Sequence, residues 1–173
     1  MPPARGAAQY GWGDRRRAGI DLFHPESKSM TTVDPSRVHG MWRLLSFRER
    51  RDDGNWFEYL GEAAPGYISY WPSGMMQVFM AARDRPRFRG AWAEIPDADK
   101  ATCLDRMIAY AGRYSLDGDL VRHHVELCWI PNWEKRDLVR RVSFPAADRL
   151  LLTTVPEVVG FGALQEVLWE PAR

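Results

Sequence analysis

The sequence predicts an all-β protein: a closed, antiparallel, up-and-down β-barrel of about eight to nine strands with one short helix inserted. Short runs rich in aromatic and β-branched residues follow one another from Gly40 onward, and turn residues separate them. Strands and helices do not alternate as they do in parallel sheets, and no glycine-rich phosphate loop follows a strand. Closing the sheet removes its exposed edges, so we favour a barrel over the alternative, a two-sheet sandwich.

Length and composition indicate one barrel domain behind a tail. The 173 residues are 45% hydrophobic and 12% aromatic, which suffices for a single core. Residues 1–37 are rich in Gly, Pro, Arg and Ser and show no periodicity. We therefore expect a flexible tail over residues 1–37 and the barrel domain over residues 38–173.

Charge and cysteine content indicate which binding partners and which cellular compartment to expect. The 24 basic and 23 acidic residues give a net charge of +1, so we expect neither nucleic acid nor a membrane as a partner. Cys103 and Cys128 make neither a disulfide framework nor a zinc site, which favours a reducing, cytoplasmic location. No stretch resembles a signal peptide or the ~20 apolar residues of a membrane span.

The strands are predicted from runs that flank turn residues. Residues 41–50 and 55–60 flank Asp53-Gly54, a favoured hairpin dipeptide. Residues 66–71 and 75–82 flank the turn Pro72-Ser73-Gly74 in the same way. Further strands are predicted within 112–130 on either side of Asp117-Gly118, and then at 137–144, 149–155 and 163–170, with turns at Pro145 and at 159–162.

One segment has helical spacing. In PDADKATCLDRMIAYAG, residues 96–112, apolar side chains recur every three or four positions, with Asp97 placed to cap the start and Gly112 to cap the end. We therefore predict one helix there, inserted between two strands of the barrel.

Several predicted strands mix polar and apolar side chains on both faces. In residues 121–130, Val121, His123, Val125, Leu127 and Trp129 share one face if the strand alternates regularly. A barrel of about eight strands can hold one small ligand among aromatic side chains, although such side chains can equally form an ordinary core. The residues expected to contact a ligand are Trp42, Tyr67, Tyr70, Met76, Arg113, His123, Trp129 and Trp133.

Two groups of residues are candidates for acid/base chemistry. His124 and Glu126 stand two apart on one strand, so a carboxylate could orient an imidazole or share a proton with it. The alternative is a histidine satisfied structurally by its neighbours. Tyr110 and Tyr114, with Arg113, could donate to a developing oxyanion, or could simply pack at the helix end. Adjacent histidines cannot both face one ion, so we expect no metal, and no cofactor is indicated.

The segments GMWRLLSFRER, GYISYWPSGMMQV, AYAGRYSLDGDLVRHHVE and PNW, in this order, resemble the bacterial and fungal lipocalin-like domain proteins from about Val38 to Glu170. The resemblance implies a lipocalin-type barrel with an internal ligand cavity, and some members resemble parts of secondary-metabolite pathways. More distant barrels of this type include cofactor-free cyclases. The chain departs from the family pattern after Trp133, where Glu134-Lys135 stands in place of a small residue and a glycine.

Two functions follow as expectations. The first is a binding protein for an apolar or amphiphilic small molecule. The second is a cofactor-independent cyclase or isomerase that acts on a polyketide- or terpenoid-like intermediate and uses His124, Glu126 or a tyrosine to move one proton. A homodimer with a filled barrel is the third alternative.

Overall fold

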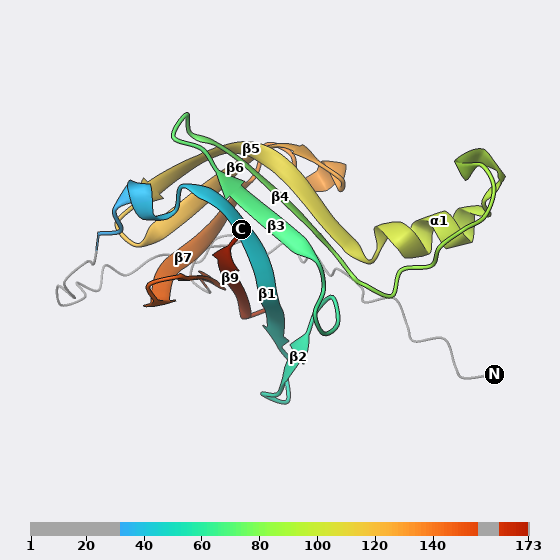
Figure 1. Ribbon diagram of the computed structural model, residues 1–173, viewed down its shortest axis with the longest axis horizontal. Helices are drawn as coiled ribbons and strands as arrows, with labels where there is room; N and C mark the ends of the chain where they lie inside the picture. Colours follow the sequence, from blue (N-terminus) through green and yellow to red (C-terminus); the bar gives the residue numbers. More distant parts are fainter. Residues whose placement is uncertain (1–31, 156–162, 173) are drawn as a thin grey trace, which may run out of the picture.

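The computed structural model describes residues 32–155 and 163–172, which fold into one antiparallel sheet with a short helix inserted (Figure 1). The elements of these described residues are β1 Gly40–Arg50, β2 Trp56–Glu58, β3 Gly66–Tyr70, β4 Met75–Ala81, α1 Asp97–Leu104, β5 Met107–Asp117, β6 Leu120–Cys128, β7 Asp137–Ala146, β8 Arg149–Thr154 and β9 Gln165–Pro171.

The sheet closes into a barrel. Strands β1, β3, β4, β5, β6, β7, β8 and β9 pair in this order, and β9 returns to pair with β1 from Trp42↔Pro171 to Glu49↔Gln165. The short strand β2 extends the sheet beyond β1 at one end. The predicted all-β, up-and-down barrel with one inserted helix is confirmed, and the sandwich is not adopted.

The predicted turns position the first strands. Gly54 has φ +84°, a conformation that glycine adopts without strain, and the hairpin around it joins β1 to β2. Gly74 has φ +81°, and across its turn the Trp71 amide donates to the Met75 carbonyl at 2.9 Å. These local signals predicted both hairpins correctly.

The helix is shorter than the spacing predicted. It ends at Leu104, and residues 107–117 instead form β5, which pairs with β4 over seven residues and with β6 on its other side. Pairing with a strand on each side stabilises residues 107–111 more than continuing the helix would, because α1 buries no side chain. The residue at the N-cap is Pro96, not Asp97. Gly112 is not a helix cap: a Cβ atom there would lie 2.0 Å from the carbonyl oxygen of His124.

A bulge interrupts the alternation of β6. The register with β5 shifts after Ala111↔Leu127, so that Gly112 pairs with Val125. His123 and Val125 therefore face the interior, whereas Leu127 is 67% exposed. The prediction that Leu127 shares a face with His123 was wrong, because regular alternation does not hold across a bulge.

The predicted turn at Pro145 is not found in the structure. Pro145 lies inside β7, where the register with β8 shifts between Ser143 and Ala146, so it marks a bulge and not a turn. The predicted turn at 159–162 and most of the predicted tail, residues 1–31, lie outside the described residues. Val33 is buried, and its amide donates to the Gly118 carbonyl at 2.9 Å, so the described chain packs on the barrel from there.

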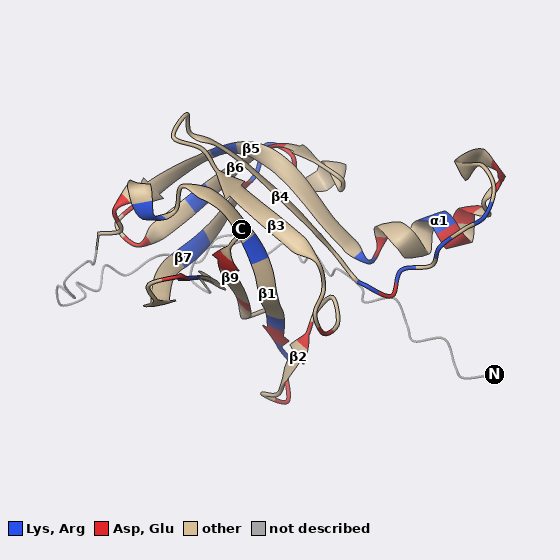
Figure 2. Ribbon diagram, viewed as in Figure 1, with Lys and Arg blue, Asp and Glu red and all other residues tan. Residues whose placement is uncertain are grey.

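Charge is distributed unevenly over the outside. Strands β3 and β4 carry no charged residue, whereas the segment leading to α1 and α1 itself carry many (Figure 2). Figure 1 shows this segment extending away from the barrel. Cys103 and Cys128 are both free. No helix among residues 32–155 and 163–172 is long and apolar enough to cross a membrane.

Candidate functional site

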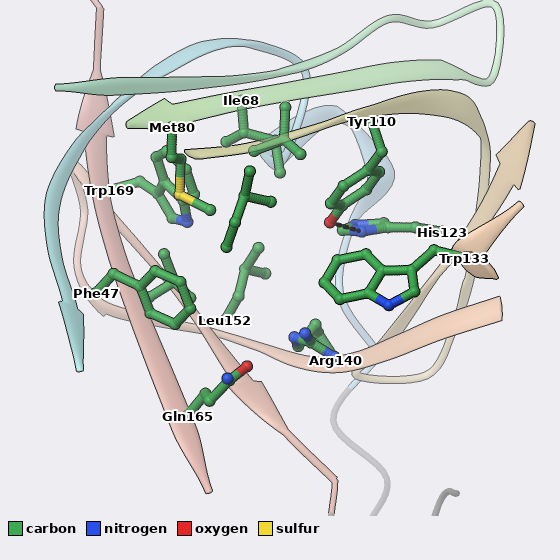
Figure 3. Close-up of a pocket in the computed structure, with 13 residues that line it drawn as sticks. Phe47, Ile68, Met80, Tyr110, His123, Trp133, Arg140, Leu152, Gln165 and Trp169 are labelled. Carbon is green, nitrogen blue, oxygen red and sulfur yellow. Dashed lines mark hydrogen bonds between the residues drawn. The ribbon is translucent and has the colours of Figure 1, made fainter. Parts of the chain in front are cut away.

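A cavity of about 40 Å³ lies inside the barrel (Figure 3). One side of it is apolar, and the other carries polar side chains from β5, β6, β7 and β9. Among the described residues, the lining has one formally charged side chain, Arg140, and no carboxylate. The lining residues are Phe47, Ile68, Val78, Met80, Ile108, Tyr110, His123, Trp133, Arg140, Leu152, Gln165, Val167 and Trp169.

A buried imidazole between two phenols is the centre of the polar side. Nε2 of His123 lies 2.7 Å from the Tyr70 hydroxyl, and Nδ1 lies 2.9 Å from the Tyr110 hydroxyl. His123 is 1% exposed. Alternation along β6 turns this side chain inward, and Figure 3 shows it beside Tyr110 and the Trp133 indole.

Burial keeps all three groups of this cluster neutral. Desolvation lowers the pKa of His123 to about 3, with smaller contributions from the charges of Arg140 and His124. Burial also raises the pKa of Tyr110 to about 12, and that of Tyr70 well above its usual value. At neutral pH the imidazole therefore has one N–H donor and one lone pair, and both phenols keep their protons.

Arg140 brings a positive charge to the cavity wall. It stands between Leu138 and Val142 on the inward face of β7 and is 8% exposed. One guanidinium nitrogen donates to the Val139 carbonyl at 3.0 Å. Burial lowers the pKa of this guanidinium, but an arginine remains protonated in the physiological range.

At the bottom of the cavity in Figure 3 lies the amide of Gln165, which donates to Glu49 at 2.7 Å. The indole of Trp169 is 1% exposed, and its Nε1 has no hydrogen-bond partner among the described residues. Both residues lie on the inward face of β9.

The structure brings some of the predicted ligand-binding residues to this cavity. His123 and Trp133 line it, and Tyr70 contacts it through His123; Tyr110, which was predicted for acid/base chemistry, lines it as well. Five others lie elsewhere. Trp42 and Met76 are buried in the core beyond the lining, and Trp129 packs against a smaller cluster. Tyr67 and Arg113 are exposed on the outside.

The residues predicted for acid/base chemistry separate into two places. His124 lies on the outer wall, where Nδ1 is 2.8 Å from Asp137 and Nε2 is 2.9 Å from Ser115. Glu126 is also outside and pairs with Arg113 at 3.5 Å. The structure thus gives His124 and Glu126 separate partners away from the cavity. The Tyr114 hydroxyl donates to the Trp71 carbonyl at 3.1 Å, at the end of the barrel.

Sequence reasoning missed Arg140, Gln165 and Trp169. The signal was present in two strands: each has one polar residue on an otherwise apolar inward face, Arg140 in β7 and Gln165 in β9. A lone polar side chain among alternating apolar ones indicates a group that a cavity or a buried partner must satisfy. No cluster of three or more potential metal ligands is found in the described part of the chain.

One comparison with known proteins, that with protein families, agrees with the fold. A family model described as a lipocalin-like domain matches residues 39–168. No curated protein matches the sequence. Among solved structures, a redesigned β-barrel is similar at 11% identity with a TM-score of 0.41, covering 80% of this chain and 94% of that one. An uncharacterized protein from Bacteroides eggerthii is similar at 10% identity and a TM-score of 0.41, covering 77% and 98%. The protein EF1p2_mFAP2b bound to DFHBI is similar at 8% identity and a TM-score of 0.39, covering 79% and 95%.

Proposed function

This chain belongs to the lipocalin-like domain family, and from that premise we propose that it binds an apolar or amphiphilic small molecule inside its barrel. The observation that carries the proposal is the division of the cavity. Ile68, Leu152 and Val167 offer an apolar wall, while Tyr110 and Arg140 offer polar groups at the other side. Ligand pockets are typically built in this way, with a few polar groups that fix the orientation of a mostly apolar molecule.

The size of the cavity implies that side chains move when a ligand binds. About 40 Å³ holds roughly three water molecules, at about 10–15 Å³ for each. Two lining residues are suited to give way: Met80 has a flexible thioether, and the half-buried Trp133 stands on the turn Pro131–Trp133 between β6 and β7. We place the access route at Trp133.

The test combines detection of a bound molecule with a blocked cavity. Native mass spectrometry of the purified protein, followed by denaturing extraction, shows whether a molecule copurifies, and a panel of apolar dyes measures binding directly. Val78→Phe fills the cavity, whereas Gln77→Phe adds the same side chain to the exposed face of the same strand. We expect Val78→Phe to lose binding and Gln77→Phe to keep it. Equal binding by both variants, or no binding by the parent protein, refutes the proposal.

A second function has a specific observation in its favour. A phenol and a guanidinium near one another in a cavity can stabilise the oxyanion that forms when a ketone enolises and gives the proton of its α-carbon to water. The protein would then be a cofactor-independent cyclase or isomerase for a polyketide- or terpenoid-like intermediate. Incubation of a bound ketone in D₂O distinguishes the two functions. An enzyme of this kind incorporates deuterium next to the carbonyl and stops doing so in Tyr110→Phe, while a binding protein leaves the ketone unlabelled.

A further inference from the structure

The hydrogen-bonded cluster Tyr70–His123–Tyr110 has three polar protons but only two internal hydrogen bonds, so one proton has no acceptor within the cluster. A neutral imidazole donates through one nitrogen and accepts through the other, whereas each phenol has one proton to donate. One tyrosine therefore donates to His123, His123 donates to the other tyrosine, and the hydroxyl proton of that second tyrosine is left over. Which tyrosine keeps the spare proton depends on the tautomer of His123.

Burial decides between the two tautomers. If Nε2 carries the proton, Tyr110 donates to Nδ1 and the spare proton belongs to Tyr70. Tyr70 is 1% exposed and does not line the cavity, and its hydroxyl has no hydrogen-bond partner among the described residues except His123. An unsatisfied buried hydroxyl costs about 1–3 kcal/mol. If Nδ1 carries the proton, Tyr70 donates to Nε2, and the spare proton belongs to Tyr110, which lines the cavity where a ligand can accept it.

A second unused donor lies across the cavity from Tyr110. The Nε1 atom of Trp169 is buried and without a partner among the described residues, and Figure 3 shows this indole on the side opposite Tyr110. Buried donors in native proteins are almost always satisfied, by protein, water or ligand. Two hydrogen-bond donors without an acceptor in one cavity favour a ligand that carries hydrogen-bond acceptors.

We propose that the ligand is a carbonyl compound whose oxygen accepts the hydroxyl proton of Tyr110, and that Tyr70 is a positioning residue which keeps this proton free by donating to His123. This inference rests on the proposed binding function and names the chemical class of its ligand. It also gives a role to a tyrosine that does not line the cavity.

The tautomer can be measured without any ligand. In ¹⁵N NMR of the imidazole nitrogens, assigned by comparison with His123→Gln, we expect the His123 proton on Nδ1. In Tyr70→Phe we expect it to move to Nε2, because Nε2 has lost the donor that kept the proton on Nδ1 and Tyr110 can then donate to Nδ1. In Tyr110→Phe it should stay on Nδ1, since Tyr70 still donates to Nε2. A proton on Nε2 in the parent protein overturns the proposal.

Binding is tested with matched pairs of probes. Phenyl alkyl ketones of increasing chain length are compared with analogues in which a methylidene group replaces the carbonyl oxygen. The parent protein should prefer the ketones by about tenfold, the worth of one net hydrogen bond. Tyr110→Phe and Tyr70→Phe should both lose this preference. Tyr114→Phe is the control and should keep it, because its hydroxyl donates to the Trp71 carbonyl.

The outcomes separate this inference from the binding function. Equal binding of ketones and methylidene analogues by the parent protein overturns the carbonyl assignment and leaves the binding function standing. An unchanged ketone preference in Tyr70→Phe overturns the positioning role. If no probe of either series binds and nothing copurifies, both the binding function and this inference are refuted.

Discussion

The Tyr70 hydroxyl lies 2.7 Å from Nε2 of His123 across the inside of the barrel, between β3 and β6, which are separated in the sheet by β4 and β5. Sheet pairing does not bring these residues together, so the bond depends on closure of the barrel. It links the polar side of the cavity to the core, because Tyr70 also packs edge-on against Tyr114 at 4.9 Å. Changes at His123 should therefore affect stability as well as binding.

Stability should fall as the pH is lowered below about 6.5. The pKa of His123 is about 3 in the folded protein and 6.5 as a model value, so between these values the unfolded chain binds a proton that the folded protein does not. Unfolding is then favoured by about 1.4 kcal/mol for each pH unit below 6.5, or about 2 kcal/mol at pH 5. Urea denaturation at pH 5 to 7 measures this slope.

Two histidine variants on β6 show where the slope comes from. His123→Gln removes the buried imidazole and should flatten the dependence in this window. His124→Gln removes an imidazole on the outer wall, beside Asp137, and leaves the buried imidazole of His123 with its slope in place. The assignment is refuted if the slope survives in His123→Gln.

The charge of Arg140 should matter for ligands that carry a carboxylate. Arg140→Met should weaken binding of a phenylalkanoic acid by at least about tenfold, because a hydrogen bond to a charged group contributes about 1.5–3 kcal/mol. Arg141→Met is a control at the next position, where the guanidinium faces outward and pairs with Asp119 at 2.9 Å. Calorimetric titration of both variants gives the comparison. Similar losses in the two variants would mean that the effect is not specific to the cavity.

Gly112 should be intolerant of any side chain. Its Cβ would lie 2.0 Å from the His124 carbonyl oxygen and 2.9 Å from the Glu126 amide nitrogen, both backbone atoms of the bulged strand. We expect Gly112→Ala to destabilise the protein by about 3 kcal/mol, at the upper end of overpacking effects. Gly61→Ala, at φ +83° with open space around it, should cost only about 1–2 kcal/mol. Denaturant midpoints decide this, and equal costs would argue against the close approach of β5 and β6.

Gly112 also shows why the sequence predicted some features and missed others. The turns at Asp53-Gly54 and Pro72-Ser73-Gly74 are local, so residue type alone indicated them. The helix end at Gly112 was predicted from equally local signals, but the role of this glycine depends on the backbone of β6, which only the paired register reveals.

The site was predictable to a similar extent. The inward face of β6 follows from alternation once one inward residue is known, and His123 and Tyr110 were among the candidates. The choice between His123 and His124 needed the orientation of the strand, which depends on barrel closure. Arg140 was detectable as one charge on an apolar face of β7, whereas the contact between Tyr70 and His123 had no sequence signal, because it joins strands that are not neighbours.

The last prediction concerns the turn that carries Trp133. Lys135 has φ +61°, the left-handed region that favours glycine. A side chain in this conformation costs roughly 1–2 kcal/mol, partly offset by the greater freedom that a glycine has in the unfolded chain. We therefore expect Lys135→Gly to stabilise the protein by about 0.5–1 kcal/mol.

The comparison is Lys100→Gly, which places glycine inside α1 and removes the ion pair with Asp97, and which should destabilise by about 1 kcal/mol. Thermal denaturation should show a higher melting temperature for Lys135→Gly and a lower one for Lys100→Gly, which supports the left-handed backbone at Lys135. An equal decrease in both variants rules it out. The amide of Lys135 donates to the Val125 carbonyl at 2.8 Å, a bond that glycine retains. Lys135→Gly should therefore leave ligand binding unchanged while it relieves the strain beneath Trp133.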